Sequence, residues 1–319
     1  MPGNRSEVDD QFNSVLAKYW NIPFLKSNSL TRSLMANLIS ACSKNGRPST
    51  IISYNPSIEN VVTGLFAQEH LDIPWIDLCA DSYDPGIGWA KYPNGARNAD
   101  GHIFLSYHAF SSCPFPRKFH LDGGIDTLEI RHIEKRNSGR IALYSGMMSK
   151  WGGVDFLLRS FDRITYPDVE LWVCGHGQNS SLKRAAKRDS RIRCFGLVSE
   201  ARLDELSRLA TIFVNPRPSG LDGNSMNFPS KILQYLSYGK PIVSTWTPGL
   251  SEDYRNVLFV LKDETEDCLA ETITRALFLS NEQRTQIAAR IGEFANDKRN
   301  WDTLAEKFLN WVEQEIIHE

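Results

Sequence analysis

The second half of this 319-residue chain alternates short apolar runs with longer amphipathic stretches. The apolar runs, rich in β-branched residues, are Ile141–Ser145, Glu170–Cys174, Arg191–Phe195, Thr211–Asn215, Pro241–Thr245 and Val257–Leu261. The stretches between them are Val154–Ile164, Leu182–Asp189, Ala201–Ala210, Pro229–Tyr238 and Glu266–Leu279. In the first stretch the apolar residues recur at i, i+3, i+4 and i+7, which is one stripe of a helix. This alternation predicts a parallel sheet with helices on both faces, a Rossmann-like α/β domain.

The first half of the chain is less regular. Leu30–Asn45 and Ile58–His70 have helical patterns, and the expected strands are Thr50–Ser53, Trp75–Cys79 and His102–Ser106. These look like βαβ units, so a second Rossmann-like domain is expected. The charged stretch Asp126–Arg140 separates the two rhythms, and the amphipathic Trp301–Ile316 needs a surface to pack on. We therefore predict domains at 1–135 and 136–300 and a closing helix at 301–319 that packs back on the first domain.

Composition and charge exclude several classes of protein. With 41% apolar and 23% charged residues, the chain is close to the globular average, which excludes disorder, collagen and coiled coils. A net charge of −2 gives no overall field for nucleic acid. No apolar stretch is long enough for a membrane span or a signal peptide, so a cytoplasmic protein is expected. The six dispersed cysteines and seven scattered histidines form no ligand motif, so neither a disulfide framework nor a metal site is expected.

An open α/β sheet binds ligands beyond the carboxyl ends of its strands, so the loops there are the places to look for chemistry. The first loop, Gly146–Gly153, is rich in glycine, carries Lys150 and leads into a helix, which favours anions. The second loop, Gly175-His176-Gly177-Gln178, is a weaker signal, because a plain tight turn has the same pattern. The third loop, Asn215–Pro218, contains Arg217.

The helix expected after the third loop has the clearest chemical pattern. Pro229 suits its first turn and Gly239 suits its end. Ser230, Lys231 and Gln234 share one polar face near its beginning. A hydroxyl, an ammonium and free backbone N–H groups there suit a diphosphate, and Arg217 could add a bidentate contact. A capped helix with a solvated lysine is the alternative interpretation.

Several blocks in the second half resemble glycosyltransferase family 4 in their order and spacing over residues 141–261. They are Tyr144-Ser145-Gly146, Gly153–Leu158, Leu171–Gly177, Phe195–Val198, Asn215-Pro216-Arg217, Phe228–Lys231, Tyr235-Leu236 and Gly239-Lys240-Pro241. Weaker matches in the first half are Ser53–Pro56, Ile73–Asp81 and His120–Asp126. The resemblance implies a GT-B fold, in which two Rossmann-like domains face each other across a cleft. The acceptor-side domain would be shortened here, and the C-terminal domain would hold a nucleotide-sugar.

The resemblance also implies a retaining transferase that needs no metal or cofactor, with the nucleotide-sugar as substrate. Arg217 and Lys231 are the candidate catalytic residues, because positive side chains stabilise a leaving diphosphate. Gln234 would face the ribose, the backbone near Leu197 and Val198 would touch the base, and Asp81 would lie on the acceptor side. The remaining candidate donor-binding residues come from the loops and the helix start: Gly146, Lys150, Gly175, His176 and Ser230.

The chain departs from the family pattern at four positions. The usual pair of glutamates falls on Met226 and Gln234, and the usual arginine and lysine of the first loop fall on Met147 and Gly152. Glutamine can donate and accept hydrogen bonds but offers no charge to the ribose.

Three functions remain in view. The leading hypothesis is transfer of a sugar from a nucleotide-sugar to a glycan or a lipid-linked acceptor. The alternatives are a non-catalytic nucleotide-sugar-binding remnant or subunit that needs a partner, and an epimerase that would need carboxylates and a histidine around the sugar.

A basic cluster also allows two interpretations. It comprises Lys183, Arg184, Lys187, Arg188, Arg191 and Arg193. It is either a solvated helix face or a peripheral contact with the inner face of an anionic membrane, which would suit a lipid-linked acceptor.

Overall fold

The structure is a computed structural model that describes residues 14–22, 25–80, 95–125, 139–177, 179–221, 223–224 and 227–317. The chain divides into two compact units. The first comprises Met1–Leu105, Ala109–Leu121 and Phe308–Glu319, and the second comprises Ser106–His108 and Asp122–Lys307. The boundary predicted between residues 135 and 136 lies outside the described residues.

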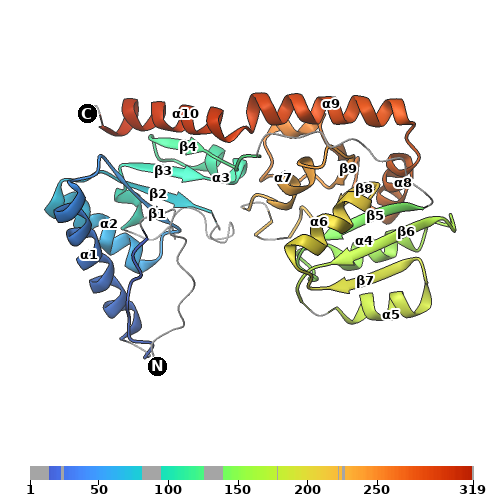
Figure 1. The fold of residues 1–319 in the computed structure, drawn as a ribbon, viewed down its shortest axis with the longest axis horizontal. Helices are drawn as coiled ribbons and strands as arrows, with labels where there is room; N and C mark the ends of the chain where they lie inside the picture. The colour runs from blue at the N-terminus through green and yellow to red at the C-terminus, as the bar shows by residue number, and fades with distance from the viewer. Residues whose placement is uncertain are drawn as a thin grey trace. The chain divides into compact units, whose positions relative to one another are not determined.

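The first unit is built on a parallel sheet whose strands follow one another in chain order, β1-β2-β3-β4. The strands are β1 Ile51–Tyr54, β2 Trp75–Cys79, β3 Gly101–Phe104 and β4 Lys118–His120 (Figure 1). The helical segments are α1 Lys26–Asn45, α2 Ile58–Leu71, η3 Ala96–Asn98 and α3 Tyr107–Ser112. The βαβ prediction is therefore confirmed, and β2 has the predicted bounds. The short α3 and β4 were not predicted, because segments of three to six residues show too little periodicity.

The end of the chain packs on this first sheet. Helix α10 (Trp301–Val312) continues into the π-helical segment η5 (Glu313–Ile317). Val312 and Ile316 are buried in one cluster with Ile76 and Ile103 of the sheet. A Cβ atom on Gly101 would overlap side chains of this final segment, so the glycine allows close packing. The apolar stripe at the end of the sequence therefore covers the first sheet.

His102 of β3 makes the stability of the first unit depend on pH. Its side chain is 2% exposed and stacks on Phe115, with ring centroids 4.3 Å apart. Burial lowers the pKa of His102 from its ordinary 6.5 to about 4, against the opposing charge of Asp100. The folded state therefore favours neutral His102, so this contribution is complete above pH 6.5 and is lost as the pH falls towards 4.

We expect the free energy of unfolding to fall between pH 6.5 and 5, with a slope of up to about 1.4 kcal/mol per pH unit. Urea titrations at each pH would measure this slope. His102→Leu should flatten it, because the titrating group is gone. The matched control is His70→Gln, which alters an exposed histidine of the same unit and leaves the buried His102 in place. A parent-like slope in His102→Leu would contradict the assignment.

The second unit contains a parallel sheet of six strands in the order β10-β9-β8-β5-β6-β7. The strands are β5 Arg140–Ser145, β6 Val169–Cys174, β7 Ile192–Gly196, β8 Ile212–Asn215, β9 Ile242–Ser244 and β10 Phe259–Val260. The first of them, β5, pairs with β6 on one side and with β8 on the other, so the winding reverses between β5 and β8. In sheets of this kind the reversal marks the ligand crevice.

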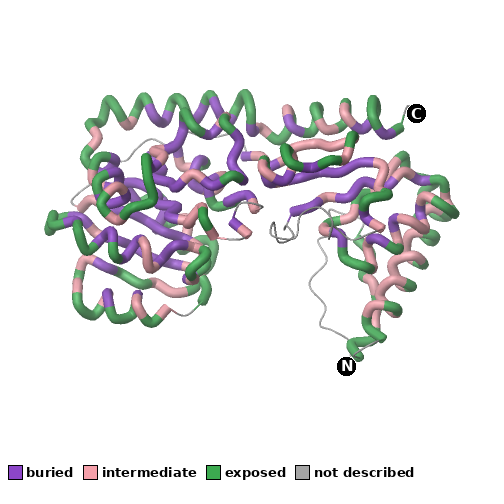
Figure 2. Tube along the Cα trace, turned by 180° about the vertical axis from the view of Figure 1, so that it is seen from behind, coloured by how far each residue is buried: buried purple, intermediate pink, exposed green. Residues whose placement is uncertain are grey.

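Helices cover both faces of this sheet, as the alternating pattern predicts (Figure 1). They are α4 Val154–Phe161, α5 Ser180–Arg188, α6 Glu200–Leu209, α7 Lys231–Leu236, η4 Glu252–Asn256, α8 Glu266–Leu277 and α9 Asn281–Lys298. Successive strand residues point to opposite faces. Ala142 and Tyr144 join the large core beneath α4, α5 and α8, whereas Ser145 bonds α7 on the other face. Figure 2 shows the central strands as the buried layer of the unit.

Two helices of this unit differ from the prediction. Helix α7 is shorter than the predicted Pro229–Tyr238, because tight turns replace regular helical bonds at both of its ends. Helix α9 was not predicted, although Ser280 and Gln283 form a capping box at its start. Its apolar residues are separated by polar side chains that leave only a weak stripe.

A buried polar cluster joins the end of α9 to the segment that follows β4. Arg299 and Asp122 form an ion pair of 3.0 Å, with side chains 7% and 3% exposed. The Tyr254 hydroxyl donates to Asp122 at 2.9 Å and accepts from Arg299 Nε at 3.0 Å. Next to this cluster, the Ile125 N–H donates to the Arg299 carbonyl. All these residues belong to the second unit, so the cluster fixes the ends of two segments remote in sequence.

Candidate functional site

The two central strands of the second sheet separate at their carboxyl ends. Pairing between β5 and β8 stops at Leu143 and Phe213, whereas pairing between β5 and β6 continues to Ser145. The hydroxyl of Tyr235 bonds this free end of β5. It accepts from the Ser145 N–H at 2.9 Å and donates to the Ser145 carbonyl at 3.1 Å. Because the Tyr235 ring also stacks on Phe213, with centroids 4.5 Å apart, it anchors α7 at the point where the strands part.

The polar side of α7 carries two of the predicted side chains. Lys231 is exposed and its Nζ donates to Gln234 Oε1 at 3.0 Å. Ser230 precedes them, exposed and without a side-chain capping bond. Burial raises the pKa of the Cys174 thiol to about 11, and the positive charge of Lys231 opposes this shift. The charge of Lys231 therefore contributes to the electrostatics at the end of β6.

The first and second loops are joined by backbone hydrogen bonds. The Gly146 N–H donates to the Cys174 carbonyl at 3.0 Å, and the Met148 N–H donates to the His176 carbonyl at 2.9 Å. The Gly175 N–H likewise donates to the Gly196 carbonyl at 2.8 Å. These bonds bring the glycine-rich loops of β5 and β6 together with the end of β7. They form a continuous surface at the carboxyl edge of the sheet.

Arg217 enters the same region from the third loop. Its Nε donates to Asn224 Oδ1 at 2.6 Å. Burial lowers the pKa of Arg217, and Tyr144 opposes the shift, but an arginine remains a cation at neutral pH. Burial raises the pKa of Tyr144 above its usual range, so this phenol is neutral, and it donates to the Met147 carbonyl at 2.7 Å. The charge of Arg217 therefore affects Tyr144, whose hydroxyl supports the first loop.

The other predicted residues lie around this region or outside the described chain. Lys150 is exposed, with its Nζ 4.6 Å from the centre of the Trp151 ring. Leu197, 79% exposed, and the half-buried Val198 follow the end of β7. Asp81, Gln178 and Met226 lie outside the described residues. The structure thus collects Arg217, Lys231, Gln234 and the loop glycines around the carboxyl ends of neighbouring strands.

Sequence reasoning missed three residues that organise the site: Tyr144, Asn224 and Tyr235. Tyr144 reads as one more apolar residue in a strand, and Tyr235 reads as one more core residue of a helix. Asn224 lies in a stretch of small polar residues that has no periodic pattern. Only the strand order, which sets β5 beside β8, could have indicated that Tyr235 meets Ser145.

Three other features bear on function: metal-ligating clusters, membrane-spanning helices and the basic cluster. Within the described ranges, no three histidine, cysteine or acidic side chains gather in a way that could hold a metal ion. None of the described helices has the length and apolarity to cross a membrane. Half of the basic cluster is paired, Arg188 with Asp162, Arg191 with Asp189 and Arg193 with Glu170. These pairs reduce the positive charge that this face offers to an anionic surface.

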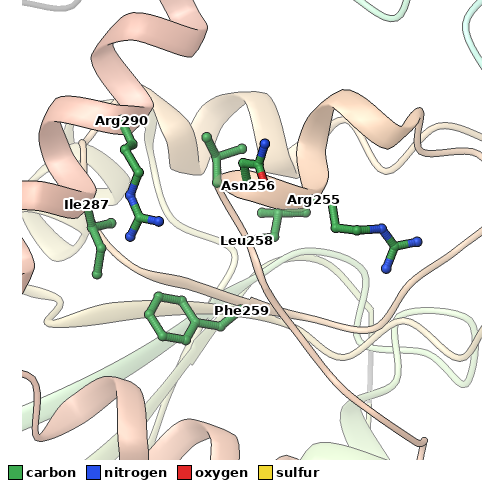
Figure 3. A pocket seen from close by; sticks show the side chains of 7 residues that line it. Arg255, Asn256, Leu258, Phe259, Ile287 and Arg290 are labelled. Carbon is green, nitrogen blue, oxygen red and sulfur yellow. The ribbon is translucent and has the colours of Figure 1, made fainter.

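A pocket of about 220 Å³ lies elsewhere on the second unit (Figure 3). It opens between α9 and the segment that leads into β10, at the amino-terminal end of that strand. It is lined by Arg255, Asn256, Val257, Leu258, Phe259, Ile287 and Arg290. None of the predicted site residues is among them, so the pocket is separate from the candidate site.

Comparison with known proteins agrees with this geometry. Residues 139–278 match the family model described as Glycosyl transferases group 1. The matched range runs from the start of β5 to the end of α8, so it contains every described residue of the candidate site. A comparison with curated protein sequences returns no match.

Three solved structures are similar over most of the chain. HepE of Anabaena, in complex with UDP, is 14% identical with a TM-score of 0.68, over 88% of this chain and 82% of its own. Sucrose-phosphate synthase of Thermosynechococcus elongatus is 14% identical with a TM-score of 0.67, over 93% and 82%. The UDP-forming trehalose-phosphate synthase of Burkholderia xenovorans, in complex with glucose-6-phosphate, is 11% identical with a TM-score of 0.70, over 90% and 77%.

At these identities the structures show the fold, which is GT-B, with two Rossmann-like units. The family match adds the activity class to this fold. Together they support a transferase enzyme with a glycosyltransferase group 1 domain at residues 139–278.

Proposed function

We propose that this protein transfers a sugar from a nucleotide-sugar, bound at the carboxyl edge of the second sheet, to a glycan or a lipid-linked acceptor. One observation carries the proposal. Two cations lie at the edge where the winding of the sheet reverses: Arg217 follows β8, and Lys231 begins α7, the helix that Tyr235 anchors to the end of β5. A nucleoside diphosphate gains negative charge as it leaves the sugar, and that charge needs such neutralisation.

The proposed reaction breaks the bond between the anomeric carbon and a diphosphate oxygen and forms a bond between that carbon and an acceptor hydroxyl oxygen. The hydroxyl proton passes to the departing diphosphate. Negative charge grows on the diphosphate, and Arg217 and Lys231 stabilise it, which leaves no need for a metal ion. Gln234, already bonded to Lys231, would bind the ribose, and the base would lie near Leu197 and Val198. The UDP of the Anabaena structure supports a uridine nucleotide as the first donor to test.

We also propose that the reaction retains the anomeric configuration, as in glycosyltransferase family 4, which the motifs of residues 141–261 resemble. Lysine and arginine at the leaving group suit a mechanism in which departure of the diphosphate runs ahead of attack. The glucose-6-phosphate bound to the trehalose-phosphate synthase relative supports a sugar as acceptor. Nuclear magnetic resonance of the first-formed product would establish its configuration.

Binding and hydrolysis assays test the donor site directly. We expect Arg217→Ala and Lys231→Ala each to weaken UDP binding about tenfold or more, because each removes a charge-assisted contact to phosphate. Calorimetry would measure the affinity, and hydrolysis of several nucleotide-sugars would measure the turnover. The matched control is Arg255→Ala, an exposed arginine paired with Glu252, which should bind as the parent does. If both site variants bind UDP as tightly as the parent, the site assignment is wrong.

A further inference from the structure

Asn224 lies at the centre of the contacts around Arg217. It is only 1% exposed, and its side-chain amide uses its full set of donors and its oxygen. Oδ1 accepts from Arg217 Nε at 2.6 Å. Nδ2 donates to the Pro218 carbonyl at 2.7 Å and to the Trp151 carbonyl at 3.2 Å. One buried side chain therefore joins the guanidinium, the third loop and the first loop.

The Asn224 side chain is neutral, and its lack of charge matters as much as its position. In the part of the chain that the structure describes, no carboxylate pairs with Arg217. Buried arginines are usually paired with an acid, because an unpaired buried charge is costly. Here the Arg217 guanidinium is oriented by a neutral amide instead. An amide oxygen fixes the direction of the guanidinium without neutralising it, so the positive charge stays available for an anion.

The bond is made through Nε, which leaves the two terminal nitrogens of the guanidinium without an intramolecular partner among the described residues. Those two nitrogens form the fork that binds phosphate in a bidentate manner. The two carbonyl contacts of Asn224 in turn prevent its amide from rotating, because a rotated amide would turn its NH₂ group towards Arg217. The oxygen therefore stays directed at Nε.

We propose that Asn224 is the positioning residue that holds Arg217, still fully charged, towards the diphosphate of the donor. This inference rests on the proposed function, because it gives Arg217 its ligand. Asn224 acts through Arg217 and touches no substrate itself. It also couples the third loop to the first, so the guanidinium keeps a fixed place relative to the first loop.

A double-mutant cycle with UDP as the probe tests this role, with calorimetry on the full chain. We expect Asn224→Ala to weaken UDP binding about tenfold. In the Arg217→Ala background the same change should weaken binding less than about twofold, because there is no guanidinium left to position. Asn224→Asp keeps an acceptor oxygen but adds a charge that pairs with Arg217. It should therefore bind UDP no better than Asn224→Ala.

Three outcomes would overturn the inference. If Asn224→Ala weakens binding equally with and without Arg217, then Asn224 has a structural role alone, while the proposed function stands. Parent-like affinity in Asn224→Asp would show that Arg217 need not keep its charge. If Arg217→Ala alone binds UDP as the parent does, this inference fails; if Lys231→Ala does so too, the proposed function fails with it. The control for lost stability is Ser280→Ala, which removes the cap of α9 and should lower the melting temperature without changing UDP affinity.

Discussion

Replacement of Asp122 by alanine is expected to lower the free energy of unfolding by about 3–5 kcal/mol. The variant leaves the Arg299 guanidinium buried without its carboxylate, and it leaves the Tyr254 hydroxyl without its acceptor. A buried charge without a partner costs far more than the pair itself contributes. The second carboxylate near Arg299, Asp253 at 3.6 Å, is half-exposed and already bonded to Lys298, so it compensates little.

Urea unfolding followed by fluorescence and circular dichroism would measure this loss. The control is Lys298→Met, which breaks the partly exposed pair with Asp253 and should cost no more than about 1 kcal/mol. Asp122→Leu combined with Arg299→Met removes both charges and should cost less than Asp122→Ala alone. A loss below about 1 kcal/mol in Asp122→Ala would show that water reaches this cluster.

Gly175→Ala is expected to disrupt the candidate site and to destabilise the second unit by several kcal/mol. The backbone of Gly175 has φ +137°, which L-residues rarely adopt, and a Cβ atom there would overlap the Gly146 carbonyl. Strain of this kind costs about 1–3 kcal/mol, and the overlap adds to it by forcing the first and second loops apart. Because the loops are joined by their backbones, UDP binding should be lost together with stability.

Substitutions at two other glycines distinguish the cost of backbone strain from the cost of steric overlap. Gly196 also has a positive φ, +66°, but its Cβ position is open, so Gly196→Ala should cost only about 1 kcal/mol. Gly220 is exposed with open space around it and no positive φ, so Gly220→Ala should be nearly neutral. Melting temperatures and UDP affinities measured side by side should rank the three variants in this order. Equal losses of stability and UDP affinity in Gly175→Ala and Gly196→Ala would mean that the first and second loops can move apart without further cost.

The fold of the second unit could be predicted from the sequence because its signals are local and repeated. Each buried strand of the sheet is a short apolar run, and most of the surrounding helices show an apolar stripe, whereas α9 leaves only a weak one. Strand order is a different kind of information. Nothing in Ile141–Ser145 or Thr211–Asn215 says that these two segments become neighbours, and this pairing decides where the crevice forms.

Only part of the candidate site could be predicted, because only some of its residues have a local signal. Arg217, Lys231 and Gln234 could be found because charged and amide groups stand out after an apolar strand or on a short helix. The supporting residues could not be found in this way. Asn224 is one polar residue among several in its loop, and its importance comes from three contacts that span 73 residues of sequence.

The main-chain hydrogen bonds between the loops affect how this site could change during evolution. The bonds that connect the ends of β5, β6 and β7 run between main-chain groups, so they are indifferent to most side chains. The exposed side chains of His176 and Leu197 stand on this scaffold without holding it together. Substitutions at such exposed positions usually change stability by less than about 0.5 kcal/mol. At the proposed donor site, substitutions at these two positions would therefore change the contacts to the donor while the backbone bonds between the strand ends stay intact.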